Sequence, residues 1–168
     1  MSRAVRLAPS ALRPFVEDAI VGRPRAAIIG LGQIGNQFDD DPKRTAVWTH
    51  AGAYAALPEI ALTAGADPDA ARLSRFLERR GVAAGYRDYQ DMLRCETIDL
   101  LSVCSPTVLH HEMVLAGVKA GVRAIFCEKP LAATVAQAAD MVRACEAAGV
   151  LLAVNHTRRW EDIYRRAK

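Results

Sequence analysis

The stretch Ala26-Ala27-Ile28-Ile29-Gly30-Leu31-Gly32-Gln33-Ile34-Gly35 decides the fold of this chain. Its first four residues have the length and apolar character of a strand that is buried on both faces. The next six have the G-x-G-x-x-G spacing, in which the first glycine permits a tight turn, the second lets a phosphate approach the backbone and the third lets a helix lie close to the sheet. Backbone amides at the start of that helix would face the phosphates. The pattern therefore predicts a binding site for a dinucleotide pyrophosphate, formed by Gly30, Gly32, Gln33, Ile34 and Gly35.

Short apolar runs alternate with amphipathic segments along the rest of the chain. The further strands that we expect are 59–66, 82–86, 98–104, 122–127 and 150–154. Helices are expected at 51–57, from the turn 67–69 to about residue 80, after Asp88, at about 107–120 and after Thr134. The last of these begins with Thr134-x-x-Gln137, which matches a capping box. This alternation predicts a single α/β domain with a doubly wound parallel sheet, that is, a Rossmann fold.

Two segments do not fit the alternation. Residues 1–24 are interpreted as an N-terminal arm, in which Pro14 can open a short helix with one apolar face. Residues 36–50 contain Asp39-Asp40-Asp41-Pro42-Lys43-Arg44, which is poor helix material. We expect this second segment to interrupt or extend the first crossover connection.

Composition and charge argue against several other classes of protein. The net charge is only +3 and the arginines are scattered, without an aromatic-interleaved basic stripe, so no nucleic-acid partner is predicted. No apolar run approaches the ~20 residues of a membrane helix, and the N-terminus lacks the apolar core of a signal peptide, so we expect a cytoplasmic protein without a membrane partner. The cysteines lack metal-type spacing and are interpreted as buried free thiols: Cys95, Cys104, Cys127 and Cys145.

Asp67 stands at the end of the second expected strand and has two compatible interpretations. An acidic side chain there can accept hydrogen bonds from both hydroxyls of an adenosine ribose, and it would repel a 2′-phosphate, which favours NAD over NADP. Alternatively, Asp67 caps the next helix, with Pro68 at its first position. The distance from Gly35 exceeds the usual ~20 residues, and the segment 36–50 accounts for the excess.

Lys129 follows the strand 122–127 at the same edge of the predicted sheet. A lysine there can donate hydrogen bonds to a substrate hydroxyl or carbonyl, with Glu128 tuning its position. Taken alone, a lysine in such a loop is most often a solvated charge. His110 and His111 point in different directions on a helix and make a poor pair of metal ligands, so no metal is predicted. Packing of one of them near the cofactor is the better interpretation.

Four motifs, in this order, resemble the glucose-fructose oxidoreductase / inositol dehydrogenase / MocA family. They are the glycine loop, Ala66-Asp67-Pro68-Asp69, the run Cys104-Ser105-Pro106-Thr107-Val108-Leu109-His110 and the most specific one, Glu128-Lys129-Pro130. The resemblance covers residues 26–160 and implies a Rossmann fold that binds NAD or NADP. It also implies hydride transfer on a sugar, cyclic polyol or related carbonyl compound.

The same resemblance implies roles for individual residues. Lys129 would be the catalytic or substrate-orienting lysine, and Glu128 would contact the nicotinamide ribose. The residues that would line the nicotinamide side of the cleft are Ser105, Pro106 and His110.

The chain departs from the family in one respect. Family members carry a second α/β domain with an Asp-x-x-x-His pair that completes a proton relay, whereas here Asp162 is followed four residues later by Arg166. We therefore interpret 25–156 as the dinucleotide-binding domain and 157–168 as the start of a connection to an absent substrate domain. The chain alone is expected to be inactive, and a catalytically idle NAD(P)-binding or sensing domain stays open as the alternative. Apolar groups left uncovered near residues 154–163 lead us to expect a homo-oligomer.

Overall fold

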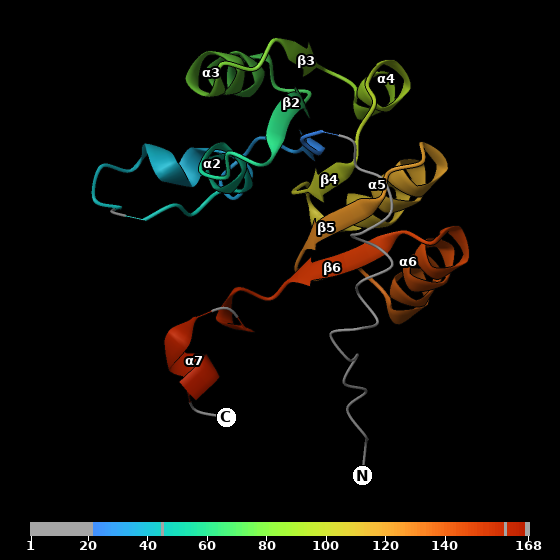
Figure 1. Ribbon diagram of the computed structural model, residues 1–168. Helices are drawn as coiled ribbons and strands as arrows, with labels where there is room; N and C mark the ends of the chain where they lie inside the picture. Colours follow the sequence, from blue (N-terminus) through green and yellow to red (C-terminus); the bar gives the residue numbers. More distant parts are fainter. Residues whose placement is uncertain (1–21, 45, 160, 167–168) are drawn as a thin grey trace.

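A computed structural model describes residues 22–44, 46–159 and 161–166 of this chain. The helix predicted to begin at Pro14 lies outside these residues. Within them, six parallel strands form one sheet in the order β3-β2-β1-β4-β5-β6 (Figure 1). The strands are β1 (Arg25–Ile29), β2 (Ala61–Ala66), β3 (Ala84–Tyr86), β4 (Leu100–Val103), β5 (Ala124–Glu128) and β6 (Leu151–Asn155). The predicted doubly wound α/β fold is confirmed.

The strand order places a potential binding crevice at the centre of the sheet. The chain moves outward from β1 to β2 and β3, then returns to the other side of β1 for β4, β5 and β6. Connections therefore leave β1 and β4 in opposite directions, and the carboxyl ends of these two strands open a crevice. In open α/β sheets, ligands bind at this switch point.

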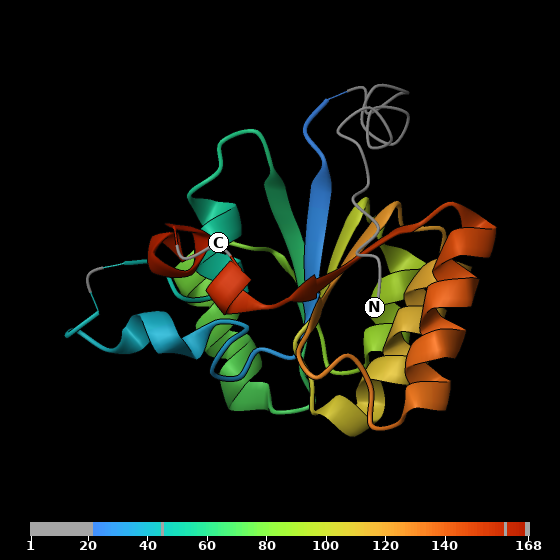
Figure 2. The ribbon, with the colours of Figure 1, turned by 90° about the horizontal axis from the view of Figure 1, so that it is seen from below.

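Helices cover both faces of the sheet, which explains why β1 is apolar and buried from Ala26 to Ile29 (Figure 2). One face carries α2 (His50–Ala55) and α3 (Ala70–Arg80); the other carries α4 (Tyr89–Cys95), α5 (Thr107–Lys119) and α6 (Val135–Ala148). Ile28 packs with Phe76 in the core of the first face, whereas Ala27 and Ile29 belong to the core of the second. None of the described helices is long and apolar enough to cross a membrane.

The four cysteines differ in burial. Cys127 and Cys145 are buried in the core beneath α5 and α6, and burial raises the pKa of the Cys127 thiol to about 12. Cys104 is half-buried and Cys95 is exposed. The prediction of buried thiols is therefore wrong for Cys95, which is the last residue of α4, a helix that buries Met92 instead.

The helix ends follow local capping rules, with one correction to the sequence analysis. Asp69, not Asp67, caps α3, because its carboxylate accepts hydrogen bonds from the amides of Ala71 (2.8 Å) and Arg72 (3.1 Å). The interpretation of Asp67 as the cap is therefore wrong. Gly81 ends the same helix in the left-handed conformation, at φ 63°.

The predicted capping box of α6 is only half formed. Thr134 accepts a hydrogen bond from the amide of Gln137 at 3.2 Å. The side-chain oxygen of Gln137 is buried and makes no hydrogen bond to the described residues, so the reciprocal bond is absent there.

The segment 36–49, called the insertion below, separates α2 from the single helical turn of the glycine loop, in which the amide of Asn36 donates to the carbonyl of Gly32 at 2.9 Å. It contains a short 3-10 helix, η2 (Gln37–Asp40), before α2 begins at His50. The amide of His50 donates to the carbonyl of Ile34 (3.1 Å), and that of Ala51 donates to Gly35 (3.0 Å). The turn of the glycine loop is thus hydrogen-bonded directly to the start of α2, and the predicted interruption of the crossover is confirmed.

Two glycines of the loop provide a matched test of this architecture. A Cβ on Gly35 would overlap the carbonyl oxygen of Gly30, whereas a Cβ on Gly32 would contact only Arg72 Nη1, at 3.9 Å. We expect Gly35→Ala to lower the free energy of unfolding by about 1–3 kcal/mol. Gly32→Ala should change it by no more than about 0.5 kcal/mol. Urea unfolding followed by circular dichroism measures both, and equal effects of the two variants would contradict the packing described for Gly35.

Candidate functional site

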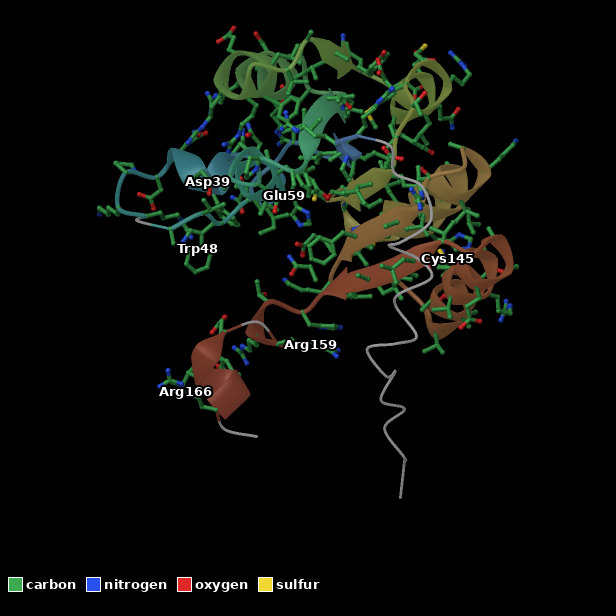
Figure 3. All side chains as sticks on the ribbon, viewed as in Figure 1. Asp39, Trp48, Glu59, Cys145, Arg159 and Arg166 are labelled. Atoms are coloured by element: carbon green, nitrogen blue, oxygen red, sulfur yellow. The ribbon has the colours of Figure 1, made fainter. Side chains whose placement is uncertain are left out.

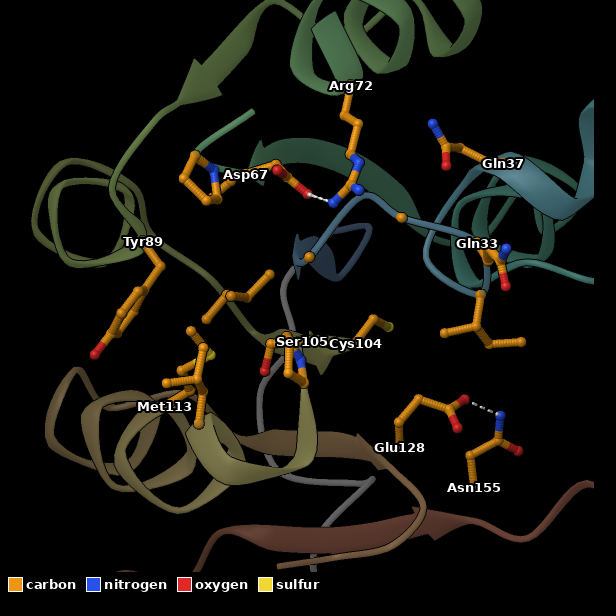
Figure 4. A pocket seen from close by; sticks show the side chains of 18 of the residues that line it. Gln33, Gln37, Asp67, Arg72, Tyr89, Cys104, Ser105, Met113, Glu128 and Asn155 are labelled. Atoms are coloured by element: carbon orange, nitrogen blue, oxygen red, sulfur yellow. Dashed lines mark hydrogen bonds and ion pairs between the residues drawn. The ribbon is translucent and has the colours of Figure 1, made fainter. Parts of the chain in front are cut away.

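A cleft of about 1190 Å³ runs along the carboxyl ends of the strands (Figure 4). It exceeds the roughly 300–1,000 Å³ of an ordinary small-molecule pocket, as an elongated ligand requires. Asp67 and Arg72 lie at one end, and Glu128 and Asn155 lie at the opposite end. The predicted site residues that line the cleft are Gly30, Gly32, Gln33, Ile34, Asp67, Ser105, Pro106, Glu128 and Lys129.

The glycine loop forms the middle of the cleft. Gly30 has φ 89°, and its amide donates to the carbonyl of Ala66 at 2.9 Å. This bond holds the turn that follows β1 against the carboxyl end of β2. Gly35 lies behind the loop against Gly30 and does not line the cleft. The open side of Gly32 therefore leaves room for a ligand to reach the backbone.

Asp67 fixes the glycine loop from the end of β2. Its side chain is only 3% exposed. One carboxylate oxygen accepts the amide of Leu31 at 2.8 Å, and the other accepts the amide of Asp69 at 2.9 Å. Arg72 Nη1 lies 3.9 Å from the first oxygen. The carboxylate is thus held in place at the cleft wall by backbone amides.

Ser105 lines the cleft, whereas His110 is buried and does not line it. The buried hydroxyl of Ser105 makes no hydrogen bond to any described residue. His110 is 1% exposed and does not line the cleft. Its ring nitrogens lie 2.8 Å from the carbonyl oxygen of Ser105 and 3.0 Å from that of Pro130. His110 therefore joins the loop after β4 to the loop after β5.

A buried polar network surrounds Glu128 at the end of β5. His50 Nε2 lies 3.0 Å from Glu128 Oε1, and the Asn155 amide donates to the same oxygen at 2.6 Å. The second oxygen, Oε2, accepts the amide of Lys129 at 3.2 Å. Behind His50, its Nδ1 lies 2.9 Å from the hydroxyl of Ser102. Four elements, α2, β4, β5 and β6, thus meet at one carboxylate.

The surroundings of Glu128 favour its ionised form. Burial by itself raises the pKa of this carboxyl. Hydrogen bonds from His50, Asn155 and the Lys129 amide, together with the charge of His50, outweigh burial and hold the pKa below its ordinary value. Lys129 itself is exposed and faces the cleft beside this carboxylate.

Sequence reasoning missed His50 and Asn155 as parts of this site. Asn155 directly follows the last expected strand, so the rule that identified Asp67, a polar residue at the carboxyl end of a parallel strand, could have found it. His50 had no such signal, because the insertion separates it from the glycine loop. Among the described residues, no group of three or more His, Cys, Asp or Glu side chains could hold a metal ion.

The sheet, the glycine loop and the cleft together define a dinucleotide-binding Rossmann domain. Residues 24–156 match the model of the oxidoreductase family with an NAD-binding Rossmann fold, GFO_IDH_MocA. The chain therefore belongs to this family, and the resemblance inferred from its motifs is confirmed.

Individual relatives are sugar and polyol dehydrogenases. The chain is 31% identical over 144 residues to myo-inositol 2-dehydrogenase of Thermotoga maritima, covering 86% of this chain and 39% of that protein. It is 37% identical over 141 residues to D-apiose dehydrogenase of Paraburkholderia graminis, covering 84% and 34%. The crystal structure of myo-inositol 2-dehydrogenase from Lactobacillus plantarum aligns with a TM-score of 0.75 at 30% identity, covering 86% of this chain and 40% of that one. The chain thus spans about two fifths of the length of these proteins or less.

The buried carboxylate predicts a pH-dependent contribution to stability. Because folding lowers the pKa of Glu128, its contribution is present above the pKa in the unfolded chain, about 4.3, and is lost as the pH falls through the folded value. We expect Glu128→Gln to lower the free energy of unfolding by about 1–3 kcal/mol at pH 7 and by much less near pH 3. Urea unfolding across this range measures the difference.

The matched control for this experiment is Glu59→Gln, because Glu59 is exposed in a turn. Its effect should stay within about 0.5 kcal/mol at every pH. A destabilisation by Glu128→Gln that is equally large at pH 3 and pH 7 would contradict the ionised role of this carboxyl.

Proposed function

We propose that this chain is the cofactor-binding part of an NAD(P)-dependent oxidoreductase that transfers a hydride between nicotinamide and a sugar, cyclic polyol or related carbonyl compound. The observation that carries the proposal is the convergence of an open glycine loop, a fixed Asp67 carboxylate and the pair Glu128-Lys129 along one cleft. The activities of the relatives, which include D-glucoside 3-dehydrogenase of Escherichia coli, support the substrate class.

The residues of the cleft fit a dinucleotide. Gly32 leaves its backbone open, so the segment from Gly32 to Ile34 would bind the pyrophosphate. Asp67 would accept the hydroxyls of the adenosine ribose. The unpartnered hydroxyl of Ser105 and the ionised Glu128 would bind the nicotinamide half. When bound, the nicotinamide supplies the hydride acceptor or donor.

The preferred cofactor is NAD rather than NADP. A 2′-phosphate would approach the buried Asp67 carboxylate, which repels it. Arg72 would be the nearest compensating cation, but it is shared between Asp67 at 3.9 Å and Asp69 at 3.8 Å. NADP-dependent relatives exist, such as scyllo-inositol 2-dehydrogenase IolU of Bacillus subtilis, so the preference is a property of these side chains and not of the family.

Lys129 is the residue that would hydrogen-bond the substrate oxygen and exchange a proton with it. Oxidation of a carbinol requires loss of its hydroxyl proton as the C–H bond breaks, and a positioned acid–base group contributes typically about 10²–10⁴-fold to the rate. The exposed Lys129 Nζ would donate to this oxygen in the protonated form and accept its proton in the neutral form. Glu128 anchors the backbone of Lys129, and His110 anchors the loop that follows it.

One observation favours the alternative of an idle NAD(P)-binding or sensing domain. Asp162 is followed four residues later by Arg166 and not by the histidine of an Asp-x-x-x-His pair. Self-association also stays a prediction, supported by the exposure of Ile163 (73%) and Leu151 (38%).

The dehydrogenase proposal predicts weak but lysine-dependent turnover. NADH formation is measured for this chain and for the Thermotoga maritima relative, each with NAD and a panel of inositols and sugars. We expect the chain to be slower by at least about 10²-fold, because it covers only 39% of the length of that relative and a positioned acid–base group contributes about this factor or more. Any residual rate should fall further in Lys129→Met. A rate comparable to that of the relative would contradict the relay argument, and turnover unchanged in Lys129→Met would contradict the role of Lys129.

A further inference from the structure

The insertion is anchored to the outside of α3 through its acidic residues. The Asp39 carboxylate accepts the amide of Trp48 at 2.7 Å and Arg80 Nη2 at 3.1 Å, and it also bonds the hydroxyl of Thr49. Burial alone would raise the pKa of Asp39, but these hydrogen bonds lower it below the ordinary value. Asp40 forms ion pairs with Arg75 and Arg79 of α3. The acidic run of the insertion, which in the sequence is only poor helix material, thus attaches the insertion to α3.

The opposite side of the insertion forms a wall of the cleft. Gln37, Phe38, Arg44 and Trp48 all line the cleft together with the glycine loop and Lys129. In Figure 3, Asp39 lies on the side of the insertion nearer α3, and Trp48 lies on the other side. One face of the insertion therefore attaches it, and the other is turned to the proposed ligand site.

Arg44 is clamped within this wall. Its guanidinium carbon lies 4.7 Å from the centre of the Phe38 ring and 4.9 Å from that of the Trp48 ring. The nearest carboxylate is that of Asp41, 3.6 Å from Nε. The buried Nε makes no hydrogen bond to any described residue. The two rings thus hold the guanidinium plane, and the Arg44 side chain, which is 29% exposed, lines the cleft.

A guanidinium held in this way is suited to one class of ligand. Its N–H groups form a planar fork that matches the geometry of carboxylate and phosphate oxygens. Aromatic stacking fixes the plane before the ligand arrives, which reduces the entropy lost on binding.

We propose that the insertion is an oxyanion-binding wall of the cleft and that Arg44 is its binding residue. The proposal rests on the function proposed above, since it places the anion in the same cleft. Two sources can supply the oxyanion: the pyrophosphate of the dinucleotide, or a carboxylate or phosphate group on the sugar-derived substrate. The binding measurements below separate the two.

The experiment uses the fluorescence of Trp48 as a local readout. Trp160→Phe removes the other tryptophan of the chain. We titrate this background and its Arg44→Gln, Arg44→Lys and Asp41→Asn derivatives with four ligands: NAD, glucuronate, glucose 6-phosphate and glucose. The three sugars are titrated both with and without NAD. We expect Arg44→Gln to weaken binding of the oxyanion ligand at least about tenfold, since charged hydrogen bonds are lost. Arg44→Lys should retain part of the affinity, and Asp41→Asn should increase it, because a competing carboxylate is removed.

The pattern of losses identifies the source. Weakened binding of NAD alone assigns Arg44 to the pyrophosphate, and weakened binding of glucuronate or glucose 6-phosphate relative to glucose assigns it to the substrate. Arg143→Gln on the exposed side of α6 is the matched control and should change nothing. Unchanged affinity for every anionic ligand in Arg44→Gln, or equal responses to the acidic sugars and to glucose without any effect on NAD, would overturn the proposal. Absence of NAD binding in all variants, with Arg44-dependent binding of the acidic sugars, would instead contradict the proposed cofactor function.

Discussion

The close approach of Gly35 to the carbonyl of Gly30 is the constraint on which both ends of the cleft depend. It closes the turn after β1, so that the single helical turn of the glycine loop lies directly against the end of this strand. The carbonyl of Gly35 then accepts the amide of Ala51, so that α2 starts against this turn although the insertion intervenes. This contact places His50 beneath the cleft beside Glu128. A turn built from glycines thus determines where the polar groups of the distant strands find their partners.

The two acidic residues of the cleft are held by different means. Asp67 is fixed by two backbone amides, whereas Glu128 depends on the side chains of His50 and Asn155 as well as on the Lys129 amide. Both arrangements supply hydrogen bonds that a buried carboxylate needs to remain charged. Each carboxylate therefore stays at a defined place along the cleft without a bound ligand.

Much of the fold could be predicted because it depends on local patterns. Apolar runs, helix caps and the glycine spacing identify the six strands and the position of the glycine loop and Asp67. The residue that caps α3 could not be predicted, because Asp67-Pro68-Asp69 contains two suitable aspartates. In the structure the Asp67 amide donates to the Tyr86 carbonyl and continues the sheet, so the helix begins later and Asp69 is its cap. The pairing of His50 with Glu128 spans 78 residues of sequence, and no local signal predicts it. The acidic run of the insertion likewise acquires its role only through α3.

The central claim, that the cleft binds a dinucleotide through the open backbone at Gly32, is tested most directly by calorimetric titration of the chain and of Gly32→Ala with NAD and NADP. The account predicts one NAD site per chain, weaker binding of NADP, and a loss of NAD affinity of at least about tenfold in Gly32→Ala, because its new methyl group occupies the approach to the backbone. Gly32→Ala must retain the unfolding transition of the parent chain for this comparison. Undetectable NAD binding by the parent chain, or equal NAD affinity in the two proteins, would contradict the account.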